Sequence, residues 1–129
     1  MIEEKHMSRL EGRTEEEKER IKASMRRLVE GRLKHGNVSE DDAAIKAAMP
    51  QAFAEALQVV TAVDEGMSRL GHYPKDDQGR IRALACQLVE GQLVRGTLDC
   101  TDAATRAAAF QAIEDARQTV IAVDEFLAL

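Results

Sequence analysis

Aromatic residues, proline and cysteine are all scarce in this chain of 129 residues. It holds three Phe, one Tyr and no Trp, with only two Pro and two Cys. Two cysteines are too few for a secreted domain held together by disulfides. The chain also lacks a continuous apolar run of about 18 residues, which a membrane-spanning helix needs, and it lacks the pattern of a secretory signal. We therefore expect a cytoplasmic protein that does not span a membrane.

A strong excess of positive charge is also missing. The net charge is −5. Residues 7–66 hold 10 basic and 12 acidic side chains, and residues 67–129 hold 7 and 9. Because nucleic-acid binding depends on a clustered positive face, this balance argues against it for either half of the chain.

One local basic cluster keeps nucleic acid open as an alternative. It consists of Arg20, Lys22, Arg26, Arg27, Arg32 and Lys34. Glu15, Glu19 and Glu30 lie among these residues at helical spacing, which favours ion pairs on a solvated surface. No aromatic side chain lies between them to stack on bases. A nucleic-acid-associated accessory protein is therefore an alternative, and nucleic acid is not the expected partner.

The strongest pattern present is an internal duplication. Shifted by 60 residues, the chain aligns with itself without a gap, and 27 of the 63 pairs from 7/67 to 69/129 are identical. Identical stretches include 28–31 with 88–91 and 62–65 with 122–125. Two copies of one sequence should share one fold. We expect a single helical domain over residues 1–129, in which 1–66 form an N-terminal tail helix plus repeat 1 and 67–129 form repeat 2.

Each repeat begins with a predicted amphipathic helix. In repeat 1, Thr14 and Glu17 form a capping-box pattern, apolar residues then recur with a helical period, and Gly36 is a stop signal. In repeat 2 the same pattern runs from Pro74 to Gly96. Both first helices carry a Glu-Gly pair near their ends.

The second helix of each repeat carries a stripe of alanines. Ser39 and its counterpart Asp99 are the predicted N-caps. Pro50 interrupts the helix in repeat 1 only, so we predict a kink or a break near Met49. That helix should continue through residues 67–70 and stop at Gly71.

The predicted fold class is all-α, with four main helices as two tandem antiparallel helical hairpins packed as a helical bundle. A short helix over residues 1–10, with Ile2, Met7 and Leu10 pointing inward, should precede them. Alanine buries little area, so the core should be thin, or completed by a partner subunit.

Residues for catalysis or metal binding are not clustered in the sequence. The histidines are His6, His35 and His72. None is spaced with another His or a Cys as zinc ligands are, and nucleotide-binding and hydrolase motifs are missing. We predict no catalytic residue, no metal and no cofactor. Cys86 aligns with Arg26, which predicts a partly exposed thiol, and Cys100 should lie in the first turn of a helix.

The Glu-Gly pairs Glu30-Gly31 and Glu90-Gly91 are the first candidates for a site. Glycine inside a helix costs about 1 kcal/mol relative to alanine. Its presence in both copies therefore indicates either a close helix crossing or a contact surface. The candidate interaction surface comprises Arg20, Glu30, Gly31, Arg80, Glu90 and Gly91.

Residues 83–91, with the sequence ALACQLVEG, resemble the inhibitory helix of the small antitoxins that silence Fic-type AMP transferases. That motif has Ser or Thr four residues before a Glu, which Gly or Asn follows. Here Cys86 stands at the hydroxyl position, and Arg26 does so in the other copy. The resemblance implies an antitoxin-like inhibitor of an enzyme that acts through Glu90.

The function expected from the sequence is a non-enzymatic helical protein–protein interaction or regulatory module. Its partner would be another protein or a second copy of the chain, as in a homodimer. Docking of helix faces would bury apolar side chains at the centre and place Glu and Arg at the rim. The nucleic-acid-associated protein and the enzyme inhibitor remain the alternatives.

Overall fold

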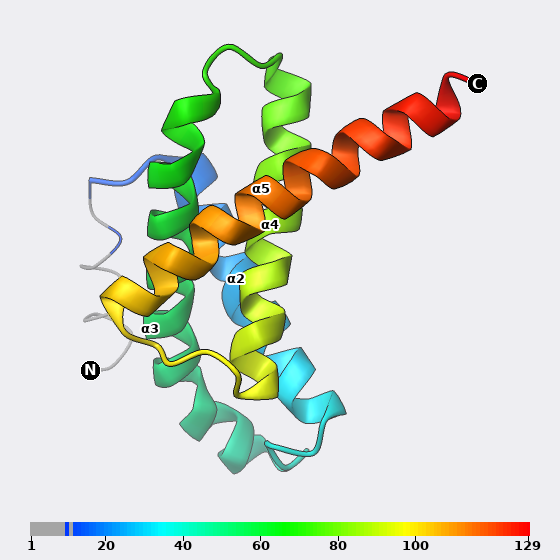
Figure 1. Cartoon of the computed structure of the whole chain (residues 1–129). Coiled ribbons are helices and arrows are strands. Elements are labelled where there is room, and N and C mark those ends of the chain that lie inside the picture. Colours follow the sequence, from blue (N-terminus) through cyan, green and yellow to red (C-terminus); the bar gives the residue numbers. More distant parts are fainter. Residues whose placement is uncertain (1–9, 11) are drawn as a thin grey trace.

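The computed structural model describes Leu10 and residues 12–129, and within them all regular structure is helical. The elements are α2 (Glu15–Lys34), α3 (Asp42–Met67), the short 3-10 helix η1 (Ser68–Leu70), α4 (Lys75–Arg95) and α5 (Asp102–Leu127). Figure 1 shows α2 with α3 and α4 with α5 as two successive hairpins. The predicted all-α bundle of two tandem hairpins is confirmed. The helix predicted over residues 1–10 lies outside the described residues, apart from Leu10, which is buried.

The ends of the first helices follow the local signals. The hydroxyl of Thr14 accepts a hydrogen bond from the backbone N–H of Glu17 at 3.1 Å, which caps α2. Gly36 and Gly96 follow α2 and α4 with φ of 75° and 73°. Glycine adopts this left-handed conformation at low cost, so both predicted stops are confirmed.

The second helices begin two residues later than predicted. Their N-caps are Asp41 and Thr101, and the hydroxyl of Thr101 accepts from a backbone N–H of its own helix. The predicted caps Ser39 and Asp99 lie in the preceding turns, where each accepts a hydrogen bond from the backbone N–H two residues on. Cys100 therefore precedes α5 instead of lying in its first turn.

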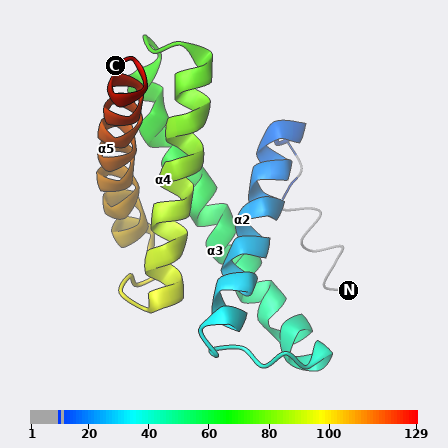
Figure 2. The same ribbon diagram turned by 90° about the vertical axis from the view of Figure 1, so that its right-hand side faces the viewer.

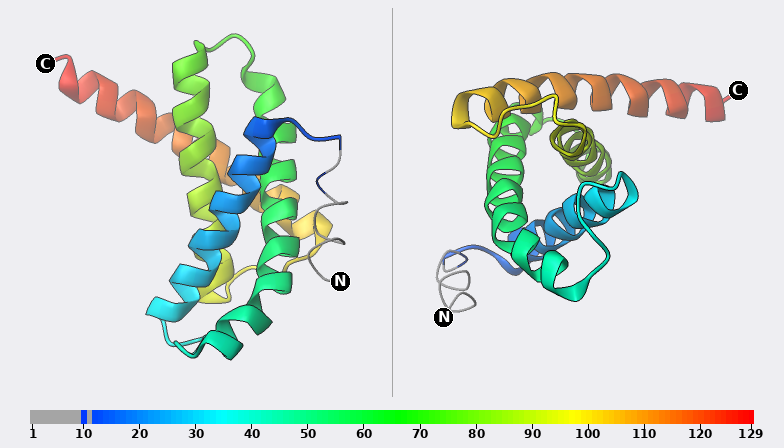
Figure 3. Two further views of the ribbon diagram at one scale, coloured as in Figure 1. Left: turned by 180° about the vertical axis from the view of Figure 1, so that it is seen from behind. Right: turned by 90° about the horizontal axis from the view of Figure 1, so that it is seen from below.

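Helix α3 continues through Pro50, so of the predicted kink or break, no break occurs and the helix bends (Figure 3). Proline removes one backbone donor and crowds the preceding turn. Figure 3 (left) shows that the axis of α3 changes direction in its N-terminal part. At the other end, α3 passes into η1 and stops before Gly71, as predicted.

The second hairpin stacks on the first in the manner of a helical repeat protein. Helix α4 contacts α2, and α5 contacts α3, so equivalent helices lie against each other (Figures 2 and 3). Helix α3 also contacts α4. The buried alanines of this stack are Ala52, Ala56, Ala62, Ala85, Ala109, Ala112 and Ala116. The alanine-rich core predicted from the sequence is confirmed. None of the described helices is long and apolar enough to cross a membrane.

Two glycines allow the hairpins to approach closely. A Cβ atom on Gly31 would lie 2.9 Å from Cγ2 of Val94 on α4, and one on Gly66 would collide with the side chain of Ile113 on α5. The glycine equivalent to Gly31 is Gly91, and there a Cβ atom would meet only the guanidinium of Arg95 on the same helix. The packing reason predicted for these glycines therefore holds at Gly31 and not at Gly91.

This difference predicts opposite effects of the same substitution. Gly91→Ala should raise the free energy of unfolding by about 0.5–1 kcal/mol, because alanine favours helix and the Arg95 side chain can move. Gly31→Ala should instead lower it by about 1–2 kcal/mol, because Val94 is β-branched and stiff within the packed junction. Urea unfolding of the two variants measures this. Equal effects would show that the crossing of α2 and α4 is not tight.

Candidate functional site

The six residues of the candidate interaction surface do not lie together. Gly31, Glu90 and Gly91 line one groove of about 270 Å³ between α2 and α4. The rest of this groove is formed by Arg27, His35, Gln87, Val94 and Arg95. Arg20 lines a second, smaller hollow between the same helices, and Glu30 and Arg80 are exposed outside both grooves.

Arg20 and Arg80 make the same ion pair in the two repeats. Arg20 donates to Asp64 at 2.7 Å, and Arg80 donates to Asp124 at 2.9 Å. Each pair joins the first helix of a hairpin to the second. The hydrogen bond from Arg80 lowers the pKa of Asp124. Each of these two arginines therefore binds an acid of its own hairpin.

The two glutamates of the Glu-Gly pairs have different surroundings although their sequences match. The side chain of Glu90 is 4% exposed, and its two oxygens accept from Nε and Nη2 of Arg27 at 2.5 and 2.9 Å. This hydrogen bonding raises the pKa of Arg27. Glu30 is exposed. Glu90 faces the neighbouring repeat, whereas Glu30 lies on the outer side of α2.

Matched substitutions should separate these roles. Glu90→Gln should lower the free energy of unfolding by about 1–3 kcal/mol, because it removes a charge-assisted bidentate hydrogen bond at a buried position. Glu30→Gln should change it by less than about 0.5 kcal/mol, as surface substitutions do. Thermal or urea unfolding provides the values. A similar loss in both variants would contradict the assignment of Glu90 to the junction.

A second buried ion pair exists in repeat 1 only. Arg32 of α2 donates to both oxygens of Glu55 on α3 at 2.6 Å, and the two side chains are 14% and 5% exposed. The hydrogen bond from Glu55 raises the pKa of Arg32. The equivalent residues in repeat 2 are Gln92 and Asp115, and Asp115 is exposed. Sequence reasoning missed this pair, because Arg32 belonged to a cluster interpreted as solvated.

The basic cluster on α2 does not form one positive face. Three of its arginines bind acids of other helices: Arg20, Arg27 and Arg32. Lys22 lies 3.6 Å from Glu19 on its own helix. Arg26 and Lys34 point outward as exposed side chains. Most of the charge in the cluster is therefore compensated within the molecule.

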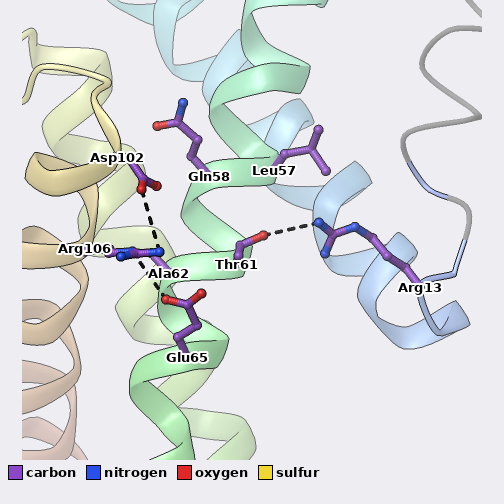
Figure 4. A pocket seen from close by; sticks show the side chains of 8 residues that line it. All are labelled: Arg13, Leu57, Gln58, Thr61, Ala62, Glu65, Asp102 and Arg106. Carbon is purple, nitrogen blue, oxygen red and sulfur yellow. Dashed lines mark hydrogen bonds and ion pairs between the residues drawn. The ribbon is translucent and has the colours of Figure 1, made fainter.

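A further groove, of about 360 Å³, lies beside α3 between the start of α2 and the start of α5 (Figure 4). Arg106 on α5 lies 3.5 Å from Glu65 and 3.7 Å from Asp102. Opposite them, Arg13 donates to the hydroxyl of Thr61 at 3.4 Å. The polar groups of the groove thus contact one another. Within residues 12–129, no three His, Cys, Asp or Glu side chains are placed to hold a metal ion.

The two cysteines are free thiols in different environments. Cys86 is buried, so the predicted partial exposure is wrong. The alignment with Arg26 failed because α4 is covered by α2 at this position, whereas the outer face of α2 is open. Burial and the nearby carboxylate of Glu90 raise the pKa of Cys86 to about 12. Cys100 is half-buried, and burial raises its pKa also.

Alkylation should distinguish the thiols, because the thiolate is the reactive form. At pH 8, iodoacetamide should modify Cys100 of the folded protein at least tenfold faster than Cys86, which is both buried and protonated. In urea the two rates should become similar. Peptide mass spectrometry at timed intervals gives both rates. Equal labelling of the native protein would contradict the burial of Cys86 at the junction.

Exposed large hydrophobic side chains are concentrated on the C-terminal half of α5. Among the described residues, the large hydrophobic side chains with high exposure are Leu88 on α4 together with Phe110, Ile121, Val123, Phe126, Leu127 and Leu129. Figures 1 and 3 show α5 crossing α4 and projecting beyond it. We call Val123, Phe126 and Leu127 the α5 apolar face.

Repeat 1 shows what this face would look like when covered. Val63 and Met67 of α3 are 0% and 3% exposed, whereas their equivalents Val123 and Leu127 are 48% and 74% exposed. In α3 this surface faces the second repeat, because α5 packs across α3 at Gly66. On α5 the equivalent surface is exposed.

Comparisons with protein-family models, with curated proteins and with solved structures find no match to this chain.

Proposed function

We propose that this protein is a non-enzymatic helical interaction module whose docking surface is the α5 apolar face. One observation carries the proposal: Val63, Gly66 and Met67 are buried in repeat 1, whereas their equivalents Val123, Phe126 and Leu127 are exposed in repeat 2. Terminal units of repeat proteins ordinarily have a polar outer surface. Exposed apolar patches commonly mark interaction sites.

The chemistry of the face defines the partner. Val123, Phe126 and Leu127 supply an apolar centre, and Asp124 and Glu125 lie beside them on the same helix. A partner surface that carries basic residues beside its contact with these apolar side chains would complement this face. In repeat 1 the equivalent acids Asp64 and Glu65 pair with arginines of the second repeat.

The alternatives receive less support. An antitoxin-like inhibitor acting through Glu90 would need an accessible carboxylate, and this one is buried and held by Arg27. A nucleic-acid-binding protein would need the cluster on α2 to be free, and most of its charge is compensated. The cytoplasmic location remains part of the proposal and rests on the sequence.

Site-specific photo-crosslinking tests the docking surface. A photoreactive amino acid at Phe126 should form an adduct in the cells that make this protein. Gln111 provides the control position on the same helix, because it and its equivalent Gln51 are both exposed. An adduct from position 126 that is absent from position 111, and that is lost on adding Leu127→Asp, supports the proposal. Absence of adducts, or equal adducts from both positions, overturns it.

A further inference from the structure

The contacts that join the two repeats have counterparts on the two open ends of the molecule. At the junction, Arg82 of α4 binds Asp64 at 3.2 Å, and Arg106 of α5 lies 3.5 Å from Glu65. In the second repeat, the residues equivalent to Asp64 and Glu65 are Asp124 and Glu125 on α5.

The residues equivalent to the two arginines of the junction lie 60 positions earlier, in the first hairpin. The counterparts of Arg82 and Arg106 are Lys22 on α2 and Lys46 on α3. Both lysines are exposed. The acidic end on α5 and the basic end on α2 and α3 therefore carry the same pairs of opposite charge as the internal junction.

The residues at the glycine crossing differ on the two open ends. Inside the molecule, Gly66 on α3 lies against Ile113 and Phe110 on α5. On the open ends, Phe126 stands in place of Gly66, and Pro50 stands in place of Phe110. The large and small residues of this pair have therefore exchanged sides.

The match is not complete, and the differences set the strength of the contact. Ile113 has Phe53 as its counterpart, so Phe126 needs a wider helix separation than that of α3 and α5. On α2, Arg26 and Lys34 replace Cys86 and Val94, which are buried at the junction. This part of the surface is polar, so the contact would be smaller than the internal junction and reversible.

We propose that the partner of the α5 apolar face is a second copy of this chain. The C-terminal half of α5 docks on α2 and the N-terminal half of α3 of the next molecule and extends the repeat stack head to tail. Asp124 and Glu125 then face Lys22 and Lys46 of that molecule. The inference rests on the proposed docking surface. Because the two contacting surfaces differ, association continues to a closed ring or an open chain instead of stopping at a dimer.

Two variants of the full chain test this arrangement. One blocks the basic end (Lys22→Glu with Lys46→Glu), and the other blocks the α5 face (Val123→Asp with Phe126→Asp). All four residues are exposed, and circular dichroism with urea unfolding checks that both variants fold. Gln51→Glu with Gln111→Glu is the control, since these positions are exposed in both repeats.

Sedimentation equilibrium then gives the mass as a function of concentration. The wild-type chain and the control should grow beyond a dimer, and each blocked variant alone should associate at least tenfold more weakly, as opposed charges become like charges or an apolar contact is lost. An equimolar mixture of the two blocked variants should form a dimer and stop there, because it retains one intact junction.

Three results would overturn the inference. They are a monomeric wild-type chain at millimolar concentration, unchanged association when the basic end is blocked, and a mixture that stays monomeric. An adduct from position 126 with a different protein, combined with a monomeric wild-type chain, would leave the proposed function standing and remove only the second copy as partner.

Discussion

A single carboxylate on α3 connects three of the four main helices. Asp64 accepts from Arg20 of α2 at 2.7 Å and from Arg82 of α4 at 3.2 Å. The first contact closes the first hairpin and the second holds the next hairpin against it. Surface ion pairs are individually weak, but this one is partly buried and lies beside the close crossing of the hairpins. The glycine crossings, the buried Glu90 and the protonated Cys86 all depend on the stacking that Asp64 supports.

The stack makes the two repeats unequal although their sequences are alike. Repeat 1 has a covered second helix and an open first helix, and repeat 2 has the reverse. Identical residues therefore take different roles: Glu30 is solvated and Glu90 is buried, and Val63 is buried while Val123 is exposed. The proposed docking surface follows from this inequality, because the surface of α3 that the second repeat covers has an exposed equivalent on α5.

The sequence predicted the features that depend on local chemistry and on the duplication. The caps at Thr14, Gly36 and Gly96 depend on neighbouring residues, so they could be located without a structure. The burial of Cys86 could not be predicted from its alignment with Arg26, because equivalent positions have different neighbours in a finite stack.

The candidate site was only partly predictable for the same reason. Gly31 was expected at a helix crossing and lies at one. The partner of Glu90 and the pair of Arg32 with Glu55 join residues far apart in the sequence, which periodicity does not reveal. The exposure of the α5 apolar face depends on which helices pack against α5 in space.

The central claim is that equivalent surfaces are covered in repeat 1 and open in repeat 2. Hydrogen exchange of residues 60–67 and 120–127, measured at low and high protein concentration, tests it most directly. The account predicts slow exchange in 60–67 at both concentrations. It predicts fast exchange in 120–127 at low concentration and protection at high concentration. Equal protection of the two segments, independent of concentration, would contradict it.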